Sequence, residues 1–183
     1  MPAETDVADR GRRERFERLA GEVMEPVRRF LVRRSDPDTA EDVLAETLLV
    51  CWRRLDDVPG EALPWAYGVA RNCLANAERG ERRRRRLAAR IATVDPPREA
   101  APPAADPDPD LSAALARLRP QDAELLRLWA WEQLTPTEIA AVLDLTVNAA
   151  NLRLHRAREK LREELRKRGT GSGHEGTTEG RRR

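Results

Sequence analysis

A segment near the C-terminal end, residues 134–161, combines two predicted helix starts with a run of arginines. Thr135, Pro136 and Glu138 have the spacing of a helix cap, a first-turn proline and a capping-box acid. The predicted helix ends at Asp144, because aspartate adopts the left-handed backbone more easily than most residues. A second helix follows at once, so the segment predicts a helix-turn-helix that binds duplex DNA.

The second helix of this pair, which Thr146 caps, has one apolar stripe and one basic side. Its apolar residues recur at steps of three and four from Val147 to Leu165, as in a helix that packs along one side. Arg153 and Arg156 fall off that stripe. A single arginine-rich helix is more often a plain solvated surface, so the DNA-binding interpretation depends on the caps, the turn and both helices together.

Charge is strongly segregated along the chain, although the net charge is only +2 over 183 residues. Residues 36–46 hold five acids and no base, whereas residues 79–90 hold seven arginines and one acid. Because charge of one sign attracts partners of the other, an acidic segment and two basic ones predict two kinds of partner, a protein and a nucleic acid.

Neither cysteine is predicted to do chemistry. Cys51 and Cys73 lack metal-ligand spacing and fall inside helical patterns, so we interpret them as small buried hydrophobic residues. The acids of residues 36–46 have no partner at ligand spacing, so neither a metal site nor a cofactor is expected. No secretory signal or apolar run of spanning length occurs, which predicts a cytoplasmic protein without membrane insertion.

The patterning predicts an all-α fold of two small helical domains joined by a Pro/Ala-rich linker. Helical periodicity covers residues 14–90, with a break at 56–64, and the polar residues 1 to about 12 are expected to be loose. Residues 91–110 contain six prolines, which predicts a flexible linker. Residues 111–168 form the second helical domain, and residues 169–183 are predicted to be a disordered tail.

Three stretches in this order resemble the extracytoplasmic-function group of the sigma-70 family of RNA polymerase sigma factors. They are AEDVLAETLLVCWRRL, LPWAYGVARNCLANAERGERRRRR and, after the prolines, LRPQDAELLRLWAWEQLTPTEIAAVLDLTVNAANLRLHRAREKL. The resemblance covers residues 14–166. It implies that the first domain is region 2, which binds the polymerase clamp and melts the minus-ten element. It implies that the second is region 4, which reads the minus-thirty-five element, and that the protein is not an enzyme.

The resemblance also implies which residues make each contact. Asp42 and Glu46 match acidic positions in the helix that docks on the core polymerase clamp, and residues 56–64 match the specificity loop that receives a flipped base. The residues expected at the melted minus-ten strand are Trp65, Asn72, Asn76, Arg79, Arg82 and Arg83. The residues expected at duplex DNA are Asn148, Asn151, Leu152, Arg153, His155 and Arg156.

Several positions depart from the family pattern or allow two interpretations. Ala45 stands where the family often has glutamine, while Asn151 and Leu152 replace a basic residue and a serine. We hypothesise that Asn151 and Leu152 shift promoter preference, since an amide pairs with adenine and an apolar group touches a thymine methyl. Trp65 is either a core anchor or a stacking platform for a base.

Two other functions were weighed against the sigma-factor interpretation. A stand-alone helix-turn-helix regulator would use the first domain to bind a signal or to dimerise, but no ligand-cavity pattern or heptad repeat appears. An enzyme acting on nucleic acid would need a metal-binding or histidine cluster. The expected partners are therefore core RNA polymerase and promoter DNA, duplex and single-stranded. The protein is expected to be a monomer, and the family adds an anti-sigma protein as a further candidate partner.

Overall fold

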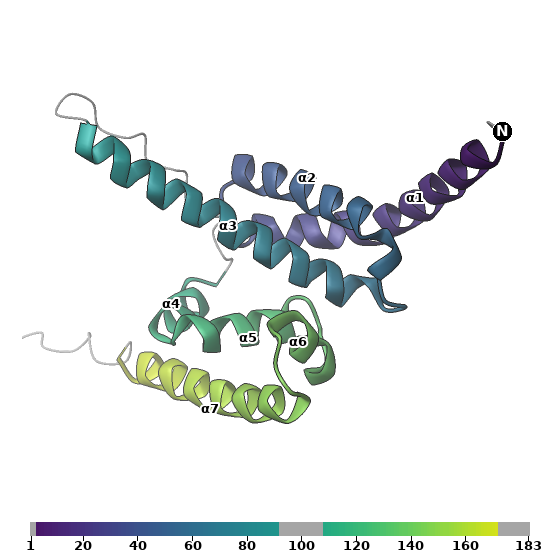
Figure 1. The fold of residues 1–183 in the computed structure, drawn as a ribbon. Helices are drawn as coiled ribbons and strands as arrows, with labels where there is room; N and C mark the ends of the chain where they lie inside the picture. Colours follow the sequence, from purple (N-terminus) through teal and green to yellow (C-terminus); the bar gives the residue numbers. More distant parts are fainter. Residues whose placement is uncertain (1–2, 92–107, 172–183) are drawn as a thin grey trace, which may run out of the picture. The chain divides into compact units, whose positions relative to one another are not determined.

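Helices make up all the regular structure of the described residues, 3–91 and 108–171, in this computed structural model (Figure 1). The predicted all-α fold is therefore confirmed. Most of the predicted linker and residues 172–183 of the predicted tail lie outside the described residues.

The chain divides into two compact units. The first contains three long helices and one short 3₁₀ turn: α1 (Ala3–Val32), α2 (Pro37–Arg53), η1 (Leu55–Asp57) and α3 (Ala62–Ile91). The second contains α4 (Pro109–Arg117), α5 (Pro120–Ala130), most of α6 (Pro136–Leu143) and α7 (Val147–Gly171).

The first unit is a three-helix bundle in which each long helix packs on the other two. Its core includes Val27 and Phe30 of α1, Val43 of α2 and Tyr67 of α3, all buried. The rings of Phe30 and Tyr67 lie 5.2 Å apart between centroids. The buried hydroxyl of Thr47 donates to the Val43 carbonyl at 2.7 Å, so this polar group is satisfied within its own helix.

The acidic helix α2 has a well-formed N-terminus. The Asp36 side chain caps it by accepting a hydrogen bond from the Thr39 amide at 3.0 Å, and Pro37 occupies the first helical position. The backbone hydrogen bond from Thr39 lowers the pKa of the Asp36 carboxyl. The lowered pKa means that the cap stabilises the fold at neutral pH and is lost as the pH falls through that pKa.

Both cysteines are buried in the first unit, as predicted. Burial raises the pKa of the Cys51 thiol to about 11 and also raises the pKa of the Cys73 thiol. Because a protonated thiol is a poor nucleophile, these residues fill space in the core.

The second unit is held together by the packing of α7 on α4 and α5. Its core includes Leu125 and Leu128 of α5, Ile139 of α6, and Leu154 and Ala157 of α7. A polar link supports this packing, since the ammonium of Lys160 lies 2.6 Å from a carboxylate oxygen of Asp122, whose side chain is 14% exposed.

The helices extend beyond several predicted boundaries, and α3 begins at Ala62, inside the break predicted at residues 56–64. The expectation that residues 1 to about 12 are loose is wrong for the described residues from Ala3 onward, because α1 begins at Ala3 and Arg12 contacts Trp52 in α2. At the other end of the linker, α4 begins at Pro109, where the Asp108 carboxylate caps it. Helix α7 continues to Gly171, three residues into the predicted tail.

Candidate nucleic-acid interfaces

The first helix of the predicted helix-turn-helix begins as the sequence indicates. In α6 the Glu138 carboxylate accepts a hydrogen bond from the Thr135 amide at 2.7 Å, and the Thr135 hydroxyl accepts one from the Glu138 amide at 3.3 Å. This reciprocal capping box satisfies two amides that the helix itself leaves without partners. The start of α6 is therefore fixed by local hydrogen bonds.

The turn between α6 and α7 depends on one residue with a left-handed backbone. Asp144 has φ of 53°, which lets the Leu145 amide donate to the Ala140 carbonyl at 2.9 Å. The Thr146 hydroxyl then accepts from the Ala149 amide at 3.2 Å, which caps α7 as predicted. Gln133 has a similar φ of 56° before α6, a feature that sequence reasoning missed.

Five of the six residues expected at duplex DNA share one face of α7. At about 100° per residue, the helix brings Asn148, Asn151, Leu152, His155 and Arg156 within a sector of about 140°. All six predicted residues are exposed, and Leu152 is 49% exposed. Arg153 lies about 140° around the helix from Asn148, so it flanks this face instead of joining it. We call the five residues on the shared face the reading face.

The basic residues of α7 differ in whether they already have partners. In the described part of the chain, neither Arg153 nor Arg156 makes an ion pair. Farther along the helix, the Arg158 guanidinium lies 4.5 Å from the Trp129 ring centroid, and Lys160 pairs with Asp122.

The C-terminal end of α7 is also paired internally. Arg162 pairs with Glu159, and Lys167 lies 2.9 Å from Glu164. The hydrogen bond from Lys167 lowers the pKa of the Glu164 carboxyl. The positive charges that remain available to an anion therefore lie toward the N-terminal half of α7.

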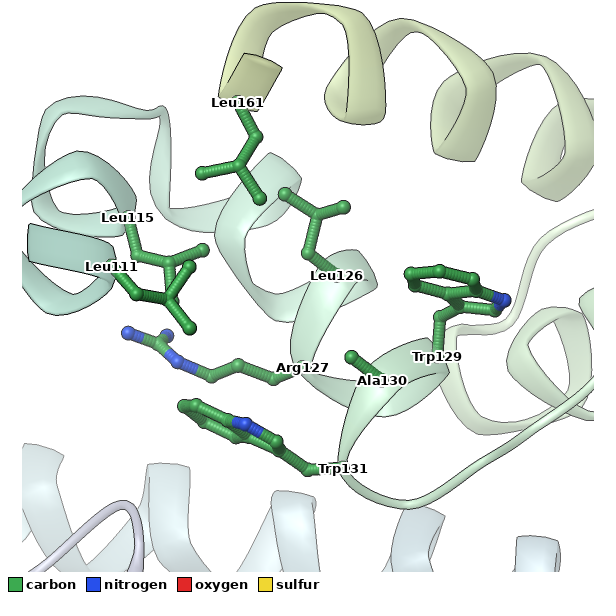
Figure 2. Close-up of a pocket in the computed structure, with 8 residues that line it drawn as sticks. All are labelled: Leu111, Leu115, Leu126, Arg127, Trp129, Ala130, Trp131 and Leu161. Atoms are coloured by element: carbon green, nitrogen blue, oxygen red, sulfur yellow. The ribbon is translucent and has the colours of Figure 1, made fainter. Parts of the chain in front are cut away.

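A small apolar pocket of about 50 Å³ lies beside Trp129 in α5 and Trp131 at the C-terminal end of that helix (Figure 2). Figure 2 shows Trp129 and Trp131 on different sides of this region, as their spacing predicts. Trp129 is 39% exposed, so it contacts α7 through Arg158 without being buried. The pocket was not predicted, because its lining comes from three helices that no local sequence signal links. Its lining residues are Leu111, Leu115, Leu126, Arg127, Trp129, Ala130, Trp131 and Leu161.

The residues expected at the melted strand largely share one face of α3. Trp65, Asn72, Asn76, Arg79 and Arg83 fall within about 60° of one another around the helix axis. The asparagines and arginines of this set are exposed, whereas Trp65 is half-buried. The Arg79 guanidinium donates to the amide oxygen of Asn76, which links two members of the set. We call these five residues the α3 polar face.

Arg82 lies off the α3 polar face, about 100° from Arg83. Its guanidinium is 3.7 Å from the Glu78 carboxylate one turn earlier. The structure therefore separates it from the other residues expected at the melted strand.

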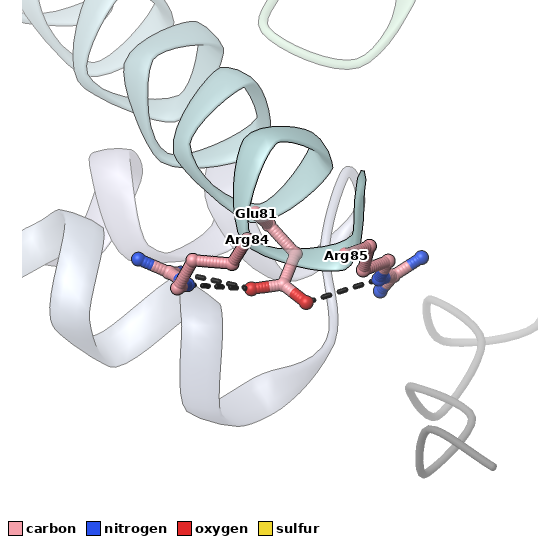
Figure 3. A network of polar contacts seen from close by, with 3 residues as sticks. All are labelled: Glu81, Arg84 and Arg85. Carbon is pink, nitrogen blue, oxygen red and sulfur yellow. Dashed lines mark hydrogen bonds and ion pairs between the residues drawn. The ribbon is translucent and has the colours of Figure 1, made fainter. Parts of the chain in front are cut away.

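The arginine run that follows is partly neutralised within the helix. Figure 3 shows Glu81 between Arg84 and Arg85, whose guanidinium groups lie 2.8 Å and 3.0 Å from its carboxylate. These hydrogen bonds lower the pKa of the Glu81 carboxyl, so it stays ionised. Arg83 and Arg86 make no ion pair within the described residues, and they are the cations of this run that an anion can reach without displacing an acid.

The loop that precedes α3 is held by charged contacts. Arg54 lies 3.0 Å from Asp57, and its guanidinium is 5.8 Å from the Trp65 ring centroid. Trp65 is therefore a partly covered ring beside the loop, a position compatible with packing and with stacking. Pro59, Gly60 and Glu61 are exposed at the tip.

The acidic face of α2 has two carboxylates without ion pairs in the described chain. Asp42 and Glu46 are exposed one turn apart, whereas neighbouring Glu41 is paired with Arg28 at 2.7 Å. Leu49 continues the same face and is 45% exposed. An apolar side chain beside unpaired acids is a suitable surface for a basic protein partner.

Comparison with known proteins identifies the family to which the chain belongs. A family model described as "Sigma-70, region 4" matches residues 110–161. The RNA polymerase sigma factor CarQ of Myxococcus xanthus is 36% identical over 160 residues, which cover 85% of this chain and 91% of CarQ. The chain belongs to the extracytoplasmic-function group of RNA polymerase sigma factors.

A second relative and two solved structures are also similar to this sigma factor. The RNA polymerase sigma-E factor of Streptomyces avermitilis is 31% identical over 136 residues, which cover 73% of this chain and 74% of the relative. Among solved structures, the sigma factor RpoE in complex with the anti-sigma factor NepR, from Bartonella quintana, has a TM-score of 0.59 at 22% identity, covering 82% of this chain and 96% of RpoE. CnrH, solved with the cytosolic domain of CnrY, has a TM-score of 0.54 at 25% identity, covering 82% of this chain and 87% of CnrH.

Two kinds of feature are absent from the described residues. Across residues 3–91 and 108–171, no helix is both long enough and apolar enough to cross a membrane. Within the same ranges, His, Cys, Asp and Glu side chains form no group of three or more that could hold a metal ion.

The left-handed turn at Asp144 generates a stability prediction for this sigma factor. We expect Asp144→Val to lower the free energy of unfolding by about 1–2 kcal/mol, because a β-branched residue is strained at positive φ. Asp144→Gly should lower the free energy of unfolding by roughly a few tenths of a kcal/mol at most, because glycine adopts this backbone freely. Urea denaturation of both variants measures the difference, and an equal loss in both would contradict the role of the backbone.

Proposed function

We propose that this sigma factor binds core RNA polymerase through α2 and directs it to promoters that α7 reads as duplex DNA and α3 holds as a melted strand. The similarity to CarQ, which spans both units, is the observation that carries the proposal. A relative similar only in the helix-turn-helix would leave the role of the first unit open.

The reading face of α7 supports duplex recognition. A helix that enters the major groove reads base edges with side chains near its N-terminus, and Asn148, Asn151 and Leu152 lie in the first two turns of α7. Arg156 adds a cation without an ion pair in the described chain, which can bind a base edge or a phosphate. Asn151 donates a hydrogen bond to the Val147 carbonyl at 3.2 Å, so its amide must break a weak local contact to bind adenine.

The α3 polar face supports the second role. An amide presents both a donor and an acceptor, so the exposed Asn72 and Asn76 can bind the edge of an unpaired base. Arg79 and Arg83 continue the same face toward the C-terminal end of α3, where they can bind the phosphates of the same strand. Base recognition and backbone binding then follow one line along a single helix.

The acidic face of α2 is proposed to dock on the polymerase clamp. Asp42 and Glu46 are free to pair with basic residues, and the exposed Leu49 can be buried in the same interface. Because each DNA-binding face is small, we expect the complex with core polymerase to form before tight promoter binding. The site of action would then be the cytoplasm, where the polymerase is.

We also propose that a protein partner controls this sigma factor. CnrH is known in complex with the cytosolic domain of CnrY, and RpoE in complex with the anti-sigma factor NepR. An inhibitor that covers the acidic face of α2 would compete directly with the polymerase. Such competition needs no change within the sigma factor itself.

A stand-alone helix-turn-helix regulator is the alternative, and run-off transcription separates the two functions. The assay uses purified bacterial core polymerase and the DNA upstream of the protein's own gene, with and without the protein. Initiation that depends on the protein is expected. If the protein shifted this DNA without polymerase and no start site appeared, the regulator would replace the sigma factor as the proposed function.

The reading face is tested by Arg156→Ala. We expect promoter affinity of the polymerase complex to fall about tenfold, as for the loss of one contact worth roughly 1–3 kcal/mol. Arg162→Ala is the matched control, since that arginine lies on the same helix and already pairs with Glu159. Fluorescence anisotropy of labelled promoter DNA measures both variants, and equal losses would contradict the assignment of the reading face.

The polymerase-binding face is tested by Glu46→Ala. We expect affinity for core polymerase to fall roughly fivefold, while DNA binding at saturating polymerase stays unchanged, because the lost charge pair is at the rim of a protein interface. Glu41→Ala is the control on the same helix, since its carboxylate is engaged by Arg28. A competition assay for core polymerase separates the two, and a Glu46→Ala variant that lost only DNA binding would overturn the assignment.

A further inference from the structure

The early turns of α1 pack on the end of α2, where the loop that precedes α3 begins. Phe16 meets the Trp52 ring edge to face, with centroids 5.3 Å apart and planes at 79°. The guanidinium of Arg12 lies 4.9 Å from the centroid of the same ring. These contacts join residues about 40 positions apart, so α1 holds the last turn of α2 through packing as well as charge.

Arg12 also completes the hydrogen bonding of α2. Its guanidinium donates to the Trp52 carbonyl at 2.9 Å, and this carbonyl is one of the last four in the helix, which have no partner within it. A cation at this position is favoured further by the negative end of the helix dipole. Arg12 therefore fixes where α2 ends and where the loop starts.

A second arginine of α1 reaches into the loop itself. Arg15 donates to the Asp56 carboxylate at 2.8 Å, and a nitrogen of Arg12 lies 3.9 Å from the other carboxylate oxygen. Asp56 lies in the short 3₁₀ turn η1. The next residue, Asp57, pairs with Arg54, which in turn lies near the Trp65 ring. Asp56 is thus bound to α1, whereas Asp57 is bound to Arg54, which lies beside Trp65 of α3.

We infer that Arg12, Arg15 and Asp56 form a clasp that positions the specificity loop and so sets which base the loop accepts. This inference rests on the proposed role of the α3 polar face at the melted strand and on the expectation from the sequence that the specificity loop receives a flipped base. Arg12 and Arg15 are positioning residues, since they act through Asp56 and Trp52 and not by contact with DNA. The clasp gives the N-terminal turns of α1 a part in promoter selection.

The physical reason is preorganisation. Pro59, Gly60 and Glu61 at the loop tip are exposed, so little packing restricts their backbone. The contacts at the start of the loop therefore limit the conformations that the tip can adopt. A loop already held in its binding shape loses less conformational entropy when it receives a base. If the clasp is released, the loop samples other shapes and accepts the wrong base more readily.

A double-mutant cycle in the full-length protein with core polymerase tests the clasp. The variants are Arg15→Ala, Asp56→Ala and the double change, with Arg15→Lys as the conservative replacement. Run-off transcription is measured on four templates that differ only in the base at the proposed flipped position. The readout is the ratio of the preferred base to the others, which a general loss of stability would not change.

We expect each single alanine variant to lower this ratio about threefold to fivefold, the range that fits an exposed ion pair. The double variant should lose no more than either single variant, because both remove the same interaction. Arg15→Lys should retain most of the ratio. Arg18→Ala is the matched control on α1 and should leave the ratio unchanged, since among the described residues its guanidinium bonds only the Glu14 carbonyl of its own helix.

Asn72→Ala, measured in the same assay, separates failure of the clasp from failure of the proposed function. If Asn72→Ala changes the ratio and Arg15→Ala does not, the clasp is overturned and the proposed function stands. If neither variant changes the ratio, both are overturned. Additive losses from Arg15→Ala and Asp56→Ala would also overturn the clasp, because the two residues would then act separately.

Discussion

Burial of one stripe of α7 determines which of its charges face outward. Ala150, Leu154 and Ala157 are buried where α7 packs on α4 and α5, and a rigid helix then has no freedom to turn. The reading face must point away from this core, whereas Lys160 is brought beside Asp122. The hydrophobic effect that stabilises the second unit therefore also orients the side chains that are proposed to bind DNA.

The same constraint organises α3 in the first unit. Its buried side, which includes Tyr67 and Cys73, holds the helix in the bundle and leaves the α3 polar face exposed. A helix of 30 residues is about 45 Å long at about 1.5 Å per residue, so one polar face can follow a strand over many nucleotides. In both units the proposed recognition surface is therefore the exposed side of a helix that is buried along its other side.

Local signals were predictable from the sequence, and long-range contacts were not. The capping box at Thr135, the turn at Asp144 and the burial of Cys51 each depend on neighbouring residues or on periodicity. The helical N-terminus of α1 was mispredicted, because its contacts with Trp52 span about 40 positions and leave no local pattern. The pocket beside Trp131 was missed for the same reason.

The pairing of Glu81 with Arg84 and Arg85 changes the thermodynamics of any phosphate binding there. A bare arginine cluster gains affinity because small cations leave the nucleic acid and enter the solvent when the cluster binds. At these two arginines one carboxylate that cannot leave the protein already offsets part of the positive charge, so a phosphate that binds them competes with Glu81 and gains less affinity. Glu81 is thus a counterion fixed within the helix, which lowers the electrostatic gain from counterion release at Arg84 and Arg85, whereas Arg83 makes no ion pair within the described residues.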